Sequence, residues 1–505
     1  MALRWVGSGG ACLLLAATMG ACTVGPDFEA LPRPVTPQAT SELAGETLKG
    51  GVVVPSAWWK VLDDPVLDTI EQRVLHANLE LAEAATRIEQ ARASLRVAGA
   101  SGLPRAGAAA SYLRERASDN GTRSLGSSAG PLPGSAGGAD PAGATSVPAS
   151  GEAFDLFQAG FDASWELDLW GRNRRAREAA GADMQAAILD HEAARISLSA
   201  EVARTYMMLR GAETRVRLLE SNREIVRAGL HIANARQQRG VATRYDAATA
   251  ATQLSAIDAQ LPLAQRQTAE ARNALALLAG EEPHALDALL AQPEAAIPGS
   301  IGGLPASLPS DLARSRPDIM AAEAELHAAT ARIGMAEADF YPSISLTGSF
   351  GLQSLTTGLL PEWDSRQFIA GPAVRLPIFE GGRLKGRLQL AEAGQKRAAI
   401  RYRAAVLRAW HEIDNALTAV RAEDARAVAA QEGLEQSRVA AHVAERRYER
   451  GASGYLDVIV AQRARLERES EWAQAQTDRA VALAALYKAL GGGWMPPQSP
   501  ADAAG

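Results

Sequence analysis

The hydrophobic pattern of the chain is dominated by one very long stretch with helical character. Residues 172–238 contain no proline and only three glycines, and most of the stretch consists of Ala, Arg, Glu, Leu and Gln, which favour helices. At about 1.5 Å per residue the predicted helix is roughly 100 Å long, whereas helices of globular proteins average ~10 to 14 residues. A compact domain has no use for a helix of this length.

The same stretch occurs twice in the chain. Landmark residues recur at a constant offset of 211 (382 minus 171). The matching landmarks are Gly171-Arg172 with Gly382-Arg383, Glu201 with Glu412, Arg239-Gly240 with Arg450-Gly451, Asp246 with Asp457, and Gly280 with Gly491. A register held over such a length predicts an internal duplication.

Before each long helix the hydrophobic period changes to two, which predicts strands. Large apolar residues alternate with polar ones over residues 157–169, 343–353 and 367–378, and residues 104–116 are a weaker candidate. Such lengths suit strands that cross a bilayer at a tilt, about 9 to 11 residues. Three carboxylates, Asp162, Glu166 and Asp168, lie on the polar side of one strand and are candidates for a water-filled pore. The alternative is an ordinary solvated strand face.

These patterns give a plan for the whole chain. A single helix from Pro65 to Gly99 opens the first repeat, and the return helices have heptad spacing typical of antiparallel coiled coils, with Pro262 expected to kink the first. Residues 117–153, rich in Gly, Ser, Ala and Pro, form a long loop at the hairpin tip. The predicted parts are a signal peptide (1–21), a tether (22–60), a first repeat (61–280, with hairpin 104–169, long helix 172–238 and return helix 243–280), a connector (281–316), a second repeat (317–491, with hairpin 342–379, long helix 383–449 and return helix 455–490) and a tail (492–505).

The N-terminus resembles a bacterial lipoprotein signal. Arg4 precedes a short apolar run, and Met19-Gly20-Ala21 leads directly into Cys22. In such signals the cysteine carries acyl chains, each CH₂ contributing about 0.8 kcal/mol to membrane attachment. Thr23 after the cysteine resembles an outer-membrane address. The alternative is an ordinary cleavage site followed by a chance cysteine.

Composition removes several classes of function. The formal net charge of -6 provides no basic footprint for nucleic acid. Both cysteines, Cys12 and Cys22, lie at the N-terminus, and the seven histidines are scattered without metal-ligand spacing. Since no nucleophile, base or metal constellation is visible, we expect neither an enzyme nor a cofactor, apart from covalent lipid on Cys22.

Several motifs in order resemble one family. They are Val24-Gly25-Pro26-Asp27-Phe28, Trp58-Trp59 with Asp64-Pro65, Arg316-Pro317-Asp318-Ile319, Phe340-Tyr341-Pro342, and Gly371-Pro372 with Leu376-Pro377-Ile378-Phe379. Together they resemble the TolC/NodT group of outer-membrane efflux lipoproteins. The resemblance implies a mainly α protein with a membrane β part: a trimeric α-barrel of long coiled-coil helices and a 12-stranded β-barrel with four strands from each chain. It also implies partners, a periplasmic adaptor and an inner-membrane transporter of the RND type.

Association is expected from the residues alone as well. Four strands cannot close a barrel in lipid, where each unpaired backbone group costs several kcal/mol.

The breaks between long and return helices are candidate gate and docking sites. Tyr455, Leu456 and Asp457 stand where the family has its constriction, and three copies of a leucine or a carboxylate could gate a pore. The alternative is plain turn chemistry, with glycine C-caps and aspartates in the first helical turn. The residues expected at the helix tips, facing the adaptor, are Arg239, Gly240, Asp246, Arg450 and Gly451.

The sequence therefore predicts a passive exit duct for drugs or other small solutes, lipid-anchored in the outer membrane with a large periplasmic part. Two alternatives stay open: a type I protein-secretion duct, which shares the architecture, and a non-conducting lipoprotein that scaffolds the envelope. The alternating strands argue against the scaffold.

Overall fold

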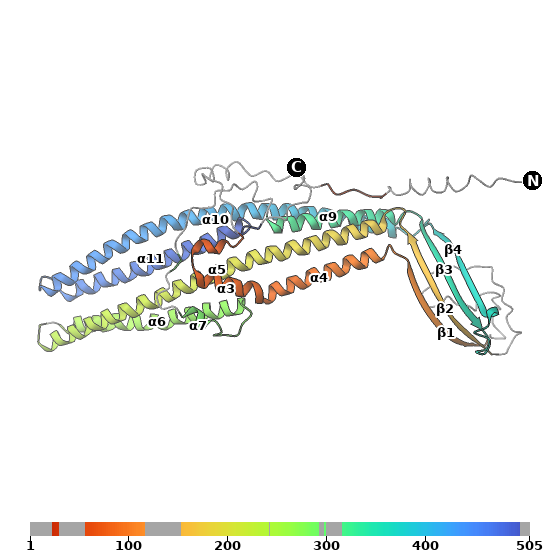
Figure 1. Cartoon of the computed structure of the whole chain (residues 1–505). Coiled ribbons are helices and arrows are strands. Elements are labelled where there is room, and N and C mark those ends of the chain that lie inside the picture. The colour runs from red at the N-terminus through yellow and green to blue at the C-terminus, as the bar shows by residue number, and fades with distance from the viewer. Residues whose placement is uncertain are drawn as a thin grey trace, which may run out of the picture. The chain divides into compact units, whose positions relative to one another are not determined.

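The computed structural model describes residues 23–29, 56–116, 153–241, 243–291, 297–298 and 316–494. Long helices and a four-stranded sheet account for most of this part of the chain (Figure 1). The elements are η2 (Trp58–Leu62), α3 (Pro65–Ala77), α4 (Leu79–Ala100), β1 (Arg105–Glu115), β2 (Phe154–Leu167), α5 (Arg172–Gln238), α6 (Arg244–Leu278), α7 (Asp287–Leu290), α9 (Pro317–Ala338), β3 (Ser343–Ser354), η3 (Trp363–Ser365), β4 (Arg366–Arg375), α10 (Arg383–Glu449) and α11 (Tyr455–Ala489).

The duplication is present in the helices residue by residue. Helices α5 and α10 each have 67 residues, α6 and α11 each have 35, and both pairs are offset by 211. Helices α4 and α9 each have 22 residues and are offset by 238 (317 minus 79). Each junction in one copy has a glycine with positive φ that recurs in the other, at 171 and 382, 240 and 451, and 280 and 491. Only glycine adopts this conformation without strain, so the helix ends are set by the same residues twice.

The chain divides into two compact units that do not follow the repeats. Unit 1 comprises residues 1–29, 91–184 and 325–398, and unit 2 comprises 30–90, 185–324 and 399–505. Both repeats contribute to both units, because α4, α5, α9 and α10 each begin in one unit and end in the other.

Unit 1 contains an antiparallel sheet in the order β1-β2-β3-β4, with strands that follow one another along the chain. The register aligns aromatic residues across three strands, Phe161 with Phe350 and Phe350 with Phe368, and all three side chains are exposed. Trp165 lies opposite Leu346 on the same face. Since side chains alternate along a strand, residues between these positions form the polar face. The sheet therefore has one apolar and one polar surface.

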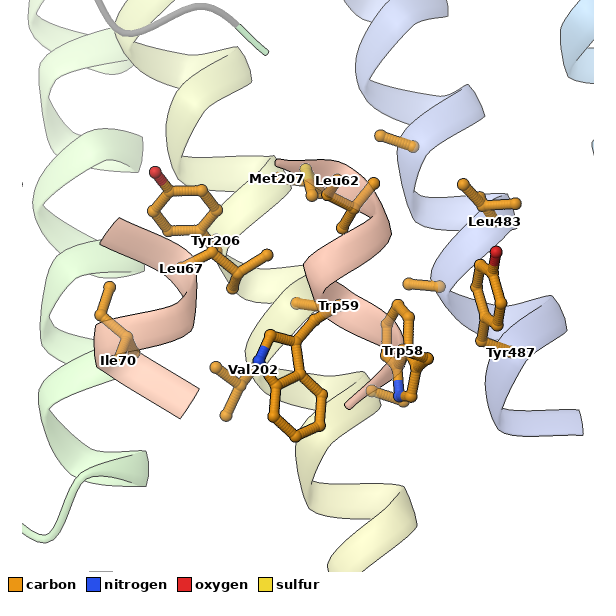
Figure 2. Packing of buried hydrophobic residues seen from close by; sticks show 14 of the residues in the cluster. Trp58, Trp59, Leu62, Leu67, Ile70, Val202, Tyr206, Met207, Leu483 and Tyr487 are labelled. Atoms are coloured by element: carbon orange, nitrogen blue, oxygen red, sulfur yellow. The ribbon is translucent and has the colours of Figure 1, made fainter. Parts of the chain in front are cut away.

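Unit 2 holds the large aromatic core. Trp58 and Trp59 of η2 are buried, and the Trp58 ring stacks on Tyr487 of α11 with ring centroids 4.9 Å apart (Figure 2). The Trp59 indole donates to Asp68 of α3 at 2.9 Å, and Tyr206 of α5 donates its hydroxyl hydrogen to Asp64 at 2.7 Å. One short N-terminal element thus connects helices from both repeats.

The predicted single helix from Pro65 to Gly99 was wrong, because Asn78 separates α3 from α4. Asn78 is extended, and its side-chain oxygen accepts the backbone N–H of Leu81, which caps α4. Its amide also donates to the Leu278 carbonyl at the end of α6. The counterpart of Asn78, offset by 238, is Arg316, which donates to the Ala489 carbonyl at the end of α11. Both repeats therefore attach their first helix to their return helix.

The predicted tether was wrong at both of its ends. Thr23–Glu29 belongs to unit 1 and is hydrogen-bonded to Trp170 and Arg175, and Trp58 and Trp59 lie in the core of unit 2. The remaining tether, the signal peptide with Cys22, loop residues 117–152, most of the connector and the tail after Trp494 lie outside the described residues. Pro262 lies inside α6, which continues past it to Leu278.

Among the described residues, no helix is both long and apolar enough to span a bilayer.

Candidate pore face and helix tips

Two of the three predicted pore residues lie on the polar face of the sheet. Asp162 is opposite Ser349, and Glu166 is opposite Ser345, so both carboxylates share their face with a row of hydroxyl groups on β3. The hydroxyl row continues with Ser343 and Thr347. This surface can be wetted while the opposite face is apolar.

Asp168 does not belong to the strand, which corrects the prediction. Strand β2 ends at Leu167, and the Asp168 carboxylate accepts the backbone N–H groups of Asn173 and Arg174 at 3.0 Å each. An acid at this position satisfies free donors in the first turn of α5 and interacts favourably with the helix dipole. The role of Asp168 is to cap the long helix.

A polar hollow of about 260 Å³ lies in unit 1 where the strands meet the helices. Charged residues of both signs line it, including Glu166 and Arg375 at strand ends. Asp339 at its wall pairs with Arg172 at 2.7 Å and lies 3.6 Å from Arg387. The hollow continues the charged character of the polar face toward the start of the long helices.

At the first helix tip, the aspartate is fully used in local capping. Thr243 is the N-cap of α6, and its hydroxyl accepts the Asp246 N–H at 3.3 Å, while the Asp246 carboxylate accepts the Thr243 N–H at 2.9 Å. This is a capping box, with aspartate in place of the usual glutamate. The turn-and-cap interpretation therefore holds for Asp246.

The second tip lacks this arrangement. The residue equivalent to Thr243 is Gly454, which caps α11 without any side-chain hydrogen bond. Among the described residues, the exposed Asp457 side chain has no hydrogen-bond partner. Leu456 beside it is 43% exposed. Leu456 and Asp457 are thus free to project from the tip.

Tyr455, predicted as part of the gate, is buried at the junction of four helices. It is 8% exposed and clusters with Ala233 of α5, Ala247 and Ala250 of α6, and Val458 of α11. Its ring lies 5.1 Å from that of Tyr448 on α10. Burial, with a smaller contribution from Tyr448, raises the pKa of Tyr455 to about 12. Tyr455 holds the two helical hairpins together at this end instead of projecting from it.

Sequence reasoning missed the residues that contact Tyr455 and its neighbour Tyr448. A Cβ on Gly229 of α5 would lie 1.9 Å from the Tyr455 hydroxyl, so a side chain at this position would force the Tyr455 ring to move. Arg236 of α5 places its guanidinium 4.0 Å from the centre of the Tyr448 ring, a cation–π contact. Gly229 was visible as one of three glycines in the long helix, but nothing local indicated its partner.

The other predicted tip residues are surface residues. Arg239, Gly240, Arg450 and Gly451 are all exposed, and the two glycines have positive φ of 76° and 69°. They form the turns of the two tips. Elsewhere, no group of three or more His, Cys, Asp or Glu residues within the described ranges could hold a metal ion.

The fold and these sites define a class: a duplicated helical-hairpin protein that carries a small amphipathic sheet. The sequence model of the outer membrane efflux protein family matches residues 71–281 and 308–492. The chain belongs to this family, which confirms the resemblance carried by its motifs.

Individual relatives agree with the family assignment. The outer membrane protein OprJ of Pseudomonas aeruginosa is 33% identical over 495 residues, covering 96% of both chains. The pyoverdine export outer membrane protein OpmQ of Pseudomonas putida is 33% identical over 438 residues, 86% of this chain and 88% of the relative. Among solved structures, the outer-membrane channel OprN has a TM-score of 0.81 at 31% identity, covering 94% of this chain and all of its own.

Proposed function

We propose that this protein is the outer-membrane exit duct of a tripartite efflux pump of the RND type, which passes drugs or other small solutes without catalysing a reaction. The amphipathic four-stranded sheet is the observation that carries the proposal. Its apolar face, with Phe161, Phe350 and Phe368, suits lipid, and its polar face, with Asp162 and Glu166, suits water.

Closure of the sheet requires more than one chain. Within the described part of the chain, strands β1 and β4 each pair with only one other strand. In lipid, the free backbone groups of both edges must be paired. Three copies provide twelve strands, and β4 of each copy can pair with β1 of the next in a closed ring. The long helices α5, α6, α10 and α11 of the same three copies then form the periplasmic α-barrel.

The helix tips provide the proposed gate and docking surface. Leu456 and Asp457 are exposed beside the anchored Tyr455, so three copies place a ring of leucines and a ring of carboxylates at the mouth of the duct. Arg239, Gly240, Arg450 and Gly451 at the exposed turns face the periplasmic adaptor, which connects the duct to the inner-membrane transporter. We further propose that Cys22 carries lipid and anchors the trimer in the outer membrane.

The proposal is tested with the purified, detergent-solubilised protein. Native mass spectrometry should give a trimer, and insertion into planar lipid bilayers should give discrete conductance steps. The double variant Leu456→Ala/Asp457→Ala should open more readily. A protein that stays monomeric and gives no conductance, even as this variant, would reject the duct and favour a non-conducting envelope lipoprotein.

A further inference from the structure

The segment Thr23–Glu29, directly after Cys22, lies against α5 and α9 in unit 1. The Val24 N–H donates to the Trp170 carbonyl at 3.1 Å, just before α5 begins. Thr23 lies beside Gly171. A Cβ placed on Gly171 would lie 2.7 Å from the Thr23 side chain. The first residues after Cys22 are therefore held at the turn that joins β2 to α5.

One arginine recognises the backbone of this segment. The side chain of Arg175 is only 5% exposed, and its guanidinium donates to the carbonyls of Val24 at 3.4 Å and Gly25 at 3.2 Å. It also donates to the Asp27 carboxylate at 2.6 Å and to Glu178 at 2.8 Å. The planar fork of a guanidinium suits several acceptors held in one geometry. The arginine thus contacts both the backbone of the segment, through two carbonyls, and its Asp27 side chain, which is otherwise largely exposed.

Two glycines allow the segment to approach α9 closely. Gly25 has a φ of +95°, and a Cβ there would lie 2.4 Å from the Gly334 Cα. A Cβ on Gly334 would lie 2.9 Å from the Val24 carbonyl oxygen and from Arg175 Nε. A side chain at either position would displace the segment, for steric reasons at both and for conformational reasons at Gly25.

The end of the segment is held by an aromatic contact linked to the same arginine. The Phe28 ring stacks on His327 of α9, with centroids 4.5 Å apart and an interplanar angle of 14°. His327 Nε2 lies 2.9 Å from Glu178, and Glu178 pairs with Arg175. Arg175, Glu178, His327 and Gly334 thus form one connected site, here called the N-terminal receptor.

The duplication supplies an internal control. With the offsets of 211 for α5 and 238 for α9, the receptor residues correspond to Gly386, Gln389, Glu89 and Arg96 in the other copy, and none keeps its chemistry. Beside Gly386 a Cβ would meet no atom within 4 Å. The helix geometry repeats in both copies, whereas the receptor residues occur in only one of them. Packing of the helices alone therefore does not require the receptor residues.

We infer that the N-terminal receptor is a dedicated binding site for the protein's own N-terminal segment. By holding Thr23 at Gly171, it fixes the residues that directly follow Cys22 where the strands meet the helices. The consequence for a membrane anchor rests on the proposed lipid at Cys22: the acyl chains would be held at the level of the sheet instead of moving on a free tether. The binding site itself does not depend on that lipid.

The test is the rate at which chymotrypsin cleaves the bond after Phe28 in the full mature protein, followed by mass spectrometry of the released N-terminal fragment. In the wild type the docked segment should resist cleavage. Arg175→Ala and Gly25→Ala should each raise the rate by about tenfold or more, through loss of charge-assisted hydrogen bonds and through strain, respectively. The control Arg177→Ala, an exposed arginine one half-turn away, should leave it unchanged.

Gly25→Ala keeps the test valid if Arg175→Ala fails to fold, because it alters the segment and not the helices. Synthetic peptides with each segment sequence correct for intrinsic cleavage rates. The inference is overturned if the wild type is cleaved as fast as its peptide, or if both variants match the wild type. Mass analysis of Cys22 is a separate readout. If the segment is protected but Cys22 carries no lipid, the proposed lipid anchor is rejected, whereas the binding of the segment to the receptor is supported.

Discussion

The two helix tips are copies of one turn, yet they use equivalent residues differently. Both begin with a glycine of positive φ and both carry an aspartate in the first turn of the return helix, Asp246 or Asp457. At the first tip Thr243 engages its aspartate in a capping box, whereas Gly454 at the second tip has no side chain to do so. The duplicated turn has the same backbone geometry at both tips. The difference between threonine at position 243 and glycine at position 454 decides whether the following aspartate caps its helix, as Asp246 does, or remains without a hydrogen-bond partner among the described residues, as Asp457 does.

The tips also differ in how their tyrosines are used. Tyr455 is buried among four helices, whereas Tyr245 at the first tip is 65% exposed. The second tip therefore contributes both the anchor between the hairpins and the exposed Leu456-Asp457 pair.

The largest expected effect comes from the tyrosine pair. Tyr455→Ala removes a buried aromatic ring and should lower the free energy of unfolding by about 3 to 5 kcal/mol locally. Tyr245→Ala should change it by less than ~0.5 kcal/mol. Hydrogen exchange of the tip helices measures both. Equal effects of the two substitutions would show that the tips are not differentiated in the way the structure indicates.

Alkaline pH should weaken the second tip through the same tyrosine. The folded pKa of Tyr455, about 12, lies above the ordinary tyrosine value of 10.0, so folding favours the neutral phenol. This contribution is complete below pH 10.0 and is lost as the pH rises toward about 12. Tyr455→Phe should remove that part of the pH dependence, as measured by tip hydrogen exchange across this range. An unchanged pH profile in Tyr455→Phe would contradict the assignment.

A moderate effect is expected from the capping box. Thr243→Ala should cost about 1 kcal/mol, because the first turn of α6 loses its side-chain acceptor. The matched change at the second tip, Gly454→Thr, supplies the missing side-chain acceptor at the N-cap and should reduce the fraying of α11. Circular dichroism and residue-resolved exchange distinguish them. A destabilisation of α11 by Gly454→Thr, as large as that of α6 by Thr243→Ala, would mean that Gly454 has a role beyond an uncapped turn.

The smallest effect on stability is expected at the exposed arginines. Arg239→Ala and Arg450→Ala should each change the melting temperature very little, since surface substitutions are usually within about 0.5 kcal/mol. Both should weaken crosslinking of the tips to a co-expressed periplasmic adaptor, if the tips dock as proposed. Unaltered crosslinking in the double variant would place the docking surface elsewhere.

Sequence reasoning predicted the long elements well for physical reasons. Helix-forming composition without proline over 67 residues, repeated at a constant offset, located α5 and α10 at the observed bounds. The alternation of apolar and polar residues located β2, β3 and β4. It also placed Asp168 in the strand, because the role of Asp168 as a cap depends on where α5 begins. Asn78 was missed because the apolar period continues across it, although asparagine before a periodic stretch is a known cap signal.

The contacts that define the sites depend on residues far apart in the chain. Gly229 receives Tyr455 and Arg175 receives Val24, pairs separated by more than a hundred residues. No local pattern specifies such partners, because glycine and arginine are ordinary residues of a long helix. The duplication could have helped: Arg175 and Gly386 are equivalent positions with different residues, and such differences between copies mark where one copy has acquired a separate task.

Single-channel conductance in planar bilayers tests the difference between the tips most directly. Asp457→Ala should change the cation selectivity and the opening of the duct, whereas Asp246→Ala should leave both as in the wild type and lower only the stability of its own tip. Gly454→Thr should mimic Asp457→Ala in part, by drawing that carboxylate into a capping box. Equal changes from Asp246→Ala and Asp457→Ala, or none from either in a conducting protein, would contradict the assignment of the gate to the second tip.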